Sequence, residues 1–220
     1  TYLSFLEIMS AQWILVPQYL LSSMRFRPPK YLPTLTISSI DEARIVNKIL
    51  QSVDIPYIEV TLRSSVSIEA IEYIADETNI NLGIGTVLNT NQLLNLPIPK
   101  IKFVVSPGFN KDVAHFCNEN NIEYIPGVET STEIMEAQNY GFDILKFFPA
   151  ELAGGVQKLK ALRSIFPNVS FMCTGGINLE NYKKYIELPN VCSVGGSFIL
   201  PKKLIKVDNV TEAINHLKLL

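Results

Sequence analysis

The chain has 220 residues, of which 47% are hydrophobic and 18% are charged, and its mean hydropathy is +0.19. This composition is typical of a globular protein and excludes a largely disordered chain, while the length suits one large domain or two small ones. The formal net charge is −2, without a basic run or an acidic tail, which argues against nucleic acid as a partner.

The first 31 residues differ from the rest because they are apolar without a regular period. Their most apolar stretch ends at Pro17 and is too short to cross a membrane. Two consecutive prolines, Pro28 and Pro29, oppose both a helix and a sheet interior. We therefore expect residues 1–31 to form an irregular N-terminal segment or arm and residues 32–220 to form the folded domain.

The cysteines and histidines bear on metal binding and on the cellular compartment. The three cysteines, Cys117, Cys173 and Cys192, form no Cys-x-x-Cys pair, and the two histidines, His115 and His216, lie about a hundred residues apart. This spacing argues against a zinc site. Cysteines that are odd in number and unpaired favour a reducing compartment, so we expect a cytoplasmic protein without a metal.

From residue 32 onward, short apolar or β-branched runs alternate with helical patterns. Eight runs predict strands, at residues 33–37, 57–62, 81–87, 102–106, 123–128, 143–148, 170–174 and 192–198. One helical pattern covers residues 39–51, and the others begin at Ser67, Thr90, Asn110, Ser131, Gly154, Asn178 and Asn209.

The predicted strands recur about every 23 residues, which is the period of a strand, a helix and two short connections. The pattern therefore predicts an α/β protein with a compact (β/α)8, or TIM, barrel. An open doubly wound sheet is the alternative, but it usually has a glycine-rich turn after its first strand, and residues 36–39 contain no glycine.

The predicted strand at residues 57–62 carries charges on one face. Period two separates an apolar face, which should meet the helices, from a face with Glu59, Thr61 and Arg63. The second face should point into the barrel, where ionised groups need partners or a wet cavity. A buried pair between Glu59 and Arg63 that serves only the fold is the structural interpretation, and catalysis is the other.

Lys146 repeats this anomaly in the run at residues 143–148, where it shares a face with Ile144 and Phe148. An ammonium inside a barrel is poorly solvated, and the neutral amine is the form that attacks a carbonyl carbon. The structural alternative is a strand that ends early, with Lys146 reaching the surface. The interior Glu59 and the glycine-rich loops downstream favour chemistry.

Two glycine pairs follow or end the last two predicted strands. Gly175 and Gly176 lead toward a predicted helix, and Gly195 and Gly196 precede Ser197. Paired glycines let backbone N–H groups approach an anion, and a helix N-terminus adds a favourable dipole. Because the loops after strands seven and eight are the common phosphate site of such barrels, we expect a phosphate site here.

Gly83 and Gly85 in the third predicted strand leave two interpretations open. They relieve crowding inside the barrel, or they clear space for a substrate and expose the hydroxyl of Thr86. The turn that contains Pro107 and Gly108 is interpreted first as a feature of shape.

Seven motifs between residues 58 and 198 resemble, in order, those of the 2-keto-3-deoxy-6-phosphogluconate (KDPG) and 4-hydroxy-2-oxoglutarate (KHG) aldolases. They are Ile-Glu-Val-Thr-Leu-Arg at 58–63, Gly-Ile-Gly-Thr-Val-Leu-Asn at 83–89, Val-Ser-Pro-Gly at 105–108, Ile-Pro-Gly-Val-Glu-Thr at 125–130, Leu-Lys-Phe-Phe-Pro-Ala-Glu at 145–151, Thr-Gly-Gly-Ile-Asn at 174–178 and Gly-Gly-Ser-Phe at 195–198. The resemblance covers about residues 32–198, and we expect it to extend to the C-terminus. Two departures stand out: the first strand carries hydroxyls at Thr34 and Thr36, and the N-terminal segment has no match.

The resemblance implies a class I lyase with a (β/α)8 fold that uses no metal or other cofactor and generally forms homotrimers. It would cleave KDPG to pyruvate and glyceraldehyde 3-phosphate, and KHG to pyruvate and glyoxylate. Lys146 would form the Schiff base and Glu59 would be the general acid and base. The expected substrate contacts are Arg63 and Thr86 at the pyruvate carboxylate, Phe148 beside the substrate, Pro107 in the wall, Thr174 in the site, and Gly175, Gly176, Gly195, Gly196 and Ser197 at the phosphate.

A phosphate-binding barrel that is noncatalytic or isomerase-like is the rival interpretation. It would keep the glycine pairs but would need no interior lysine, so Lys146 is the feature that separates the two.

Overall fold

The computed structural model describes residues 26–63 and 66–220. Its strands pair in parallel throughout. They are β1 (Tyr31–Leu35), β2 (Tyr57–Thr61), β3 (Asn81–Gly85), β4 (Ile101–Val105), β5 (Glu123–Ile125), β6 (Gly127–Val128), β7 (Ile144–Phe147), β8 (Ser170–Cys173) and β9 (Val191–Gly196).

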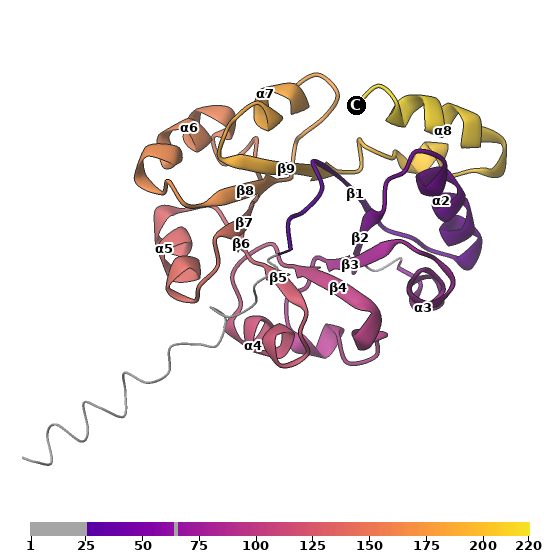
Figure 1. Ribbon diagram of the computed structural model, residues 1–220, viewed down its shortest axis with the longest axis horizontal. Helices are drawn as coiled ribbons and strands as arrows, with labels where there is room; N and C mark the ends of the chain where they lie inside the picture. The colour runs from indigo at the N-terminus through magenta and orange to yellow at the C-terminus, as the bar shows by residue number, and fades with distance from the viewer. Residues whose placement is uncertain (1–25, 64–65) are drawn as a thin grey trace, which may run out of the picture.

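The sheet closes into a barrel because its two ends belong to one predicted strand. The order is β5-β4-β3-β2-β1-β9-β8-β7-β6. β5 and β6 are separated only by Pro126, which has no backbone N–H to donate to a ladder. β5 pairs with β4 and β6 pairs with β7. β5 and β6 together therefore take the place of the fifth strand in an eight-stranded barrel. The predicted (β/α)8 barrel is confirmed, and Figure 1 shows the helices outside the ring of strands.

In the described residues, α-helices occupy seven of the eight predicted helical positions. They are α2 (Ile40–Ser52), α3 (Ile68–Glu77), α4 (Lys111–Glu119), α5 (Ser131–Asn139), α6 (Gly155–Ile165), α7 (Tyr182–Ile186) and α8 (Val210–Leu217). Four of them begin after a side chain that accepts an N–H of the first turn, namely Ser39, Ser67, Asn110 and Thr130.

The helix predicted to begin at Thr90 is wrong. The structure has two 3-10 helices in its place, Thr90–Gln92 and Ile98–Lys100. Pro97 and Pro99 explain the difference, because proline lacks a backbone donor and disfavours helical geometry in the residue before it.

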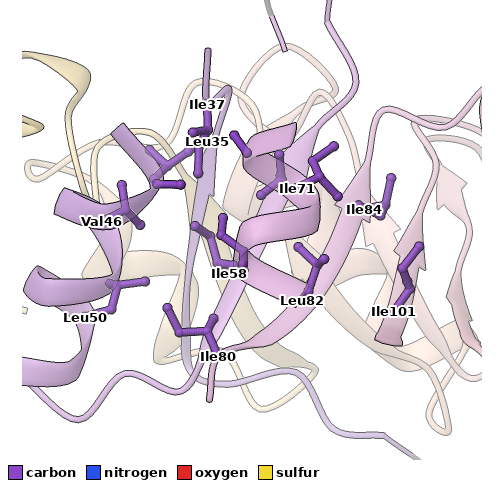
Figure 2. Packing of buried hydrophobic residues seen from close by; sticks show 14 of the residues in the cluster. Leu35, Ile37, Val46, Leu50, Ile58, Ile71, Ile80, Leu82, Ile84 and Ile101 are labelled. Atoms are coloured by element: carbon purple, nitrogen blue, oxygen red, sulfur yellow. The ribbon is translucent and has the colours of Figure 1, made fainter. Parts of the chain in front are cut away.

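A large apolar cluster between the strands and helices determines which side chains face the barrel interior. Figure 2 shows Leu35, Ile58 and Leu82 of β1, β2 and β3 together with Val46 of α2 and Ile71 of α3. Burial of each such side chain contributes about 1.5–3 kcal/mol to stability. Because successive strand residues alternate in direction, this packing turns the intervening residues inward.

The interior is closed by aromatic rings at the end where the strands begin. The ring of Phe26 stacks on that of Phe103 with 4.7 Å between centroids, and it lies 5.7 Å from the ring of Tyr57, the first residue of β2. The end at which the strands finish is therefore the open one.

The predicted N-terminal arm lies mostly outside the described residues, which begin at Phe26. β1 begins at Tyr31, one residue before the predicted start of the barrel domain. Between residues 26 and 220, leaving out 64–65, no helix is long and apolar enough to cross a membrane.

Candidate active site

Lys146 and Glu59 meet inside the barrel although they come from opposite walls. Their strands, β7 and β2, are separated in the sheet by β8, β9 and β1. The Lys146 Nζ lies 3.7 Å from the Glu59 Oε1, the lysine side chain is 7% exposed and the glutamate side chain is fully buried. Both residues thus point inward as expected, and they form a buried ion pair.

Of the two Glu59 oxygens, Oε2 accepts a hydrogen bond and Oε1 faces the Lys146 ammonium. Oε2 accepts a hydrogen bond from the Thr34 hydroxyl at 3.4 Å, whereas Oε1 has no hydrogen-bond partner among the described residues. Gly85 provides the room for this carboxylate, because a Cβ at that position would overlap it. Gly83 instead provides room for the ring of Phe103. The two glycines left open by the sequence therefore do different things.

Lys146 is held by its strand and by an aromatic ring. Its backbone N–H donates to the Pro126 carbonyl at 2.8 Å, which connects β7 to the residue between β5 and β6. Its Nζ lies 5.1 Å from the ring centroid of Phe148, within the range of a cation–π interaction. The neighbours Leu145 and Phe147 pack in the cluster on the helix side, as the alternation predicts.

A cavity of about 300 Å³ opens at the ends of the strands around this pair. Among the described residues, no cluster of three His, Cys, Asp or Glu side chains could hold a metal ion. The cavity is lined by Thr34, Leu35, Thr36, Glu59, Thr61, Arg63, Lys146, Phe148, Thr174, Gly175, Gly176, Ile177, Gly195, Gly196, Ser197 and Lys202.

Two of the predicted site residues, Thr86 and Pro107, do not line this cavity. Thr86 directly follows β3 and has a φ of 62°, a left-handed conformation that a β-branched residue rarely adopts. Pro107 follows β4, and its backbone lies so close to Gly127 that a Cβ at Gly127 would overlap it. Both lie at the same end of the barrel as the cavity, since they follow the ends of their strands.

The glycine loop after β8 is tied to the end of β7. Ala150 N–H donates to the Thr174 carbonyl at 2.8 Å, and Glu151 N–H donates to the Gly175 carbonyl at 3.1 Å. Gly175 and Gly176 have φ values of 94° and 79°, a region that favours glycine. The loop that carries the predicted phosphate contacts is therefore positioned relative to the strand that carries the lysine.

The glycine loop does not run directly into a helix, so that prediction is wrong. α7 begins only at Tyr182, and a turn at residues 178–181 intervenes. In this turn the Asn178 side chain accepts the N–H of Glu180, and the Asn181 side chain accepts the N–H of Asn178. These local hydrogen bonds compete with helix formation.

Thr174 carries a second unused polar group. The residue is 5% exposed, it lines the cavity, and its Oγ1 has no hydrogen-bond partner among the described residues. A buried hydroxyl without a partner costs about 1–3 kcal/mol, so its presence beside a cavity favours a ligand that supplies the partner.

A buried tyrosine, Tyr185, supports the glycine loop after β8 through Glu151. The Tyr185 hydroxyl donates to the Glu151 Oε1, and the side chain of Glu151 occupies the space that a Cβ at Gly176 would need. Burial and this hydrogen bond raise the pKa of the Tyr185 hydroxyl, so it remains a donor.

The sequence did not identify Thr34 or Lys202 as cavity residues. The alternation of hydroxyls in the first strand was a usable signal for Thr34, because period two turns that side chain inward. Lys202 had no such signal, because it lies in a 3-10 helix, Lys202–Leu204, beyond the last strand.

Comparisons with known proteins agree with this geometry. The family model for KDPG and KHG aldolase matches residues 23–217. A 2-dehydro-3-deoxy-phosphogluconate aldolase from Pseudoalteromonas atlantica is 37% identical over 185 residues, which are 82% of this chain and 86% of that protein.

Two solved structures share the fold over most of their length. A KDPG aldolase from Legionella pneumophila, with pyruvate captured as a covalent carbinolamine, superposes with a TM-score of 0.81 at 36% identity and covers 86% of this chain and 92% of its own. The KDPG aldolase of Zymomonas mobilis with 3-phosphoglycerate has a TM-score of 0.78 at 33% identity and covers 88% and 93%. The chain belongs to the KDPG and KHG aldolase family.

Proposed function

We propose that this chain is a class I aldolase that cleaves KDPG to pyruvate and glyceraldehyde 3-phosphate, and also cleaves KHG to pyruvate and glyoxylate. One observation carries the proposal: a buried lysine lies 3.7 Å from a fully buried carboxylate, in a cavity that the glycine loops also line. A noncatalytic or isomerase-like phosphate-binding barrel has no use for this pair, so that alternative is not favoured.

The amine of Lys146 begins the reaction by attacking the keto carbon of the substrate. The resulting carbinolamine loses water and becomes an iminium, which withdraws electrons from the bond to be broken. The carbinolamine of pyruvate in the Legionella pneumophila relative supports this step. No metal is required, because the iminium itself accepts the electron pair.

Glu59 moves the protons. It takes the proton of the distal hydroxyl, directly or through water, as the carbon–carbon bond breaks and the aldehyde leaves. The electron pair of that bond forms an enamine, and Glu59 returns a proton to its terminal carbon. Hydrolysis of the new iminium then releases pyruvate and the free lysine. The Glu59 Oε1, which has no hydrogen-bond partner in the part of the chain that the structure describes, is the acceptor that this role needs.

The remaining contacts are assigned by place in the cavity. Arg63 neutralises the pyruvate carboxylate, Phe148 packs beside the substrate, and the Thr174 hydroxyl bonds to it. Thr86 and Pro107 follow β3 and β4 outside the cavity lining, and their roles are proposed from the family resemblance. The backbone at Gly175, Gly176, Gly195, Gly196 and Ser197 holds the phosphate. The 3-phosphoglycerate in the Zymomonas mobilis relative supports a phosphorylated ligand. In keeping with the family resemblance, we propose that the protein is a cytoplasmic homotrimer.

Reduction with borohydride in the presence of pyruvate tests the proposal. We expect the mass of a reduced pyruvate imine on the peptide that contains Lys146, together with loss of turnover. Lys146→Met should abolish both the adduct and turnover, whereas Lys158→Met, which removes a lysine beside the ring of Phe147, should keep both. An adduct on another lysine, or no adduct, overturns the class I assignment.

A further inference from the structure

Lys202 lies directly beyond the last glycine loop, and its ammonium reaches back over the barrel mouth. The Nζ donates to the Thr36 carbonyl at 3.3 Å and to the Ser38 hydroxyl at 3.1 Å. It also lies 3.2 Å from the Glu42 Oε2. These contacts place a positive charge between the loop after β9 and the loop after β1, two neighbouring strands.

The order of strands puts this charge beside the glycine loops. β1, β9 and β8 are adjacent in the sheet, and Lys202 lines the same cavity as Gly195, near the end of β9, and Gly175, which follows β8. Two other cations line the cavity: Arg63 follows the end of β2 and Lys146 lies in β7, on either side of this group of strands. The glycine loops therefore have one cation of their own.

A phosphate monoester carries a charge of about −1.5 to −2 at neutral pH. Backbone N–H groups at glycine loops supply partial charges only, whereas an ammonium supplies a full one and forms charge-assisted hydrogen bonds. The buried ammonium of Lys146 is already paired with Glu59, so it does not balance the charge of the phosphate. Electrostatic balance at the phosphate end needs a cation there.

Glu42 holds Lys202 in place without burying it. Burial alone would raise the pKa of the Glu42 carboxyl, but hydrogen bonds from Ser38 and Lys202 outweigh this effect and lower it. The lysine side chain remains 53% exposed. An exposed ion pair is worth at most about 1 kcal/mol, so the ammonium can exchange this partner for a phosphate at little cost.

We propose that Lys202 is a specificity-determining residue that recognises the phosphoryl group of the substrate and so favours KDPG over the unphosphorylated KHG. This inference rests on the proposed function and adds a residue that the family motifs of this sequence do not contain. Glu42 is a positioning residue that keeps the ammonium over the mouth of the cavity before substrate arrives.

The alternative is that Lys202 only ties the two loops together. In that case its loss would affect stability and both substrates alike, and removal of Glu42 would have the same effect as removal of Lys202. In our proposal the two substrates respond differently, and only the lysine is needed for the phosphorylated one.

The test compares kcat/KM for KDPG and for KHG in four proteins, together with their thermal unfolding. Lys202→Met should lower kcat/KM for KDPG by about tenfold to a hundredfold, the usual loss for one charge-assisted hydrogen bond, and leave KHG nearly unchanged. Lys203→Met, the adjacent lysine that lines a different pocket, should change neither. Glu42→Gln should change KDPG use by less than about fivefold.

The double variant Glu42→Gln/Lys202→Met removes both charges and leaves no unpaired carboxylate. It should lose KDPG use as the lysine variant does. A substrate ratio that is unchanged in Lys202→Met, or an equal loss in Glu42→Gln, overturns the inference. A wild-type protein that cleaves KHG but shows no preference for KDPG also overturns it, while leaving the aldolase assignment intact. A wild-type protein that cleaves neither overturns the proposed function itself.

Discussion

The position of the Glu59 carboxylate depends on the absence of a side chain at Gly85, and Gly85→Ala tests this dependence. A Cβ at Gly85 overlaps the Glu59 carboxylate, and the nearest oxygen would have to move by about 1.5 Å to reach an ordinary contact distance of about 3.5 Å. A displacement of about 1 Å at a reacting group can cost about a hundredfold in rate. We expect kcat for KDPG cleavage to fall by about a hundredfold or more.

Gly83→Ala is the matched control on the same strand. A Cβ at Gly83 overlaps the ring of Phe103 instead of the carboxylate, so it should destabilise the protein by overpacking, at a cost of about 1–3 kcal/mol. We expect a lower midpoint of thermal unfolding for both variants. Only Gly85→Ala should also lose kcat in proportion to the displaced carboxylate.

The assay couples pyruvate release to lactate dehydrogenase, at a temperature well below the unfolding midpoint of each variant. Trapping of pyruvate on Lys146 with borohydride should survive in part in Gly85→Ala, because imine formation precedes the proton transfer that Glu59 performs. If folded Gly85→Ala retains the kcat of the wild type, or if Gly83→Ala loses as much, the position of the carboxylate does not limit the reaction and the argument fails.

Three other outcomes are expected. Glu59→Gln should lower kcat by about two to four orders of magnitude while borohydride trapping survives in part, and near-normal turnover would reduce Glu59 to a structural partner. Gly196→Val should lower kcat/KM for KDPG by about tenfold or more relative to KHG, because a side chain moves the loop away from the phosphate, and an equal change for both substrates would refute the phosphate contact. Burial raises the pKa of the Cys117 thiol to about 12 and that of Cys192 to about 11, and it raises the pKa of Cys173 well above its usual value. The native protein should therefore react slowly with iodoacetamide at pH 8 and take up three equivalents only when unfolded; rapid modification of the native protein would contradict this burial.

Alternation within strands carried most of what could be predicted about the site. Ile58 and Val60 pack on the helix side, so Glu59 points inward, and the same rule applied to Leu145 and Phe147 turns Lys146 inward. The approximate repeat then placed both strands in one barrel. The rule identifies which residues enter the interior, because side-chain direction along a strand is a local property of the backbone.

Local rules could not show which interior side chains meet. Lys146 and Glu59 are paired only because the sheet closes, and closure depends on β5 and β6, which Pro126 separates. The position of Lys202 depends in the same way on long-range folding, because its contacts are to Thr36 and Ser38, far from it in the sequence. The helix at Thr90 was wrongly predicted for a different reason, since a helical pattern was given more weight than Pro97 and Pro99.

The buried pair itself argues that function, and not stability, determines these residues. Removing two charges from water costs several kcal/mol for each ion, and a pair at 3.7 Å regains this only with further hydrogen bonds. Glu59 receives one such bond, from Thr34 at 3.4 Å, and its other oxygen, which faces Lys146, has no hydrogen-bond partner among the described residues. An apolar pair of similar volume would stabilise the barrel at least as well. What the apolar pair could not do is present an amine to a carbonyl carbon and a carboxylate oxygen to the proton that the reaction releases.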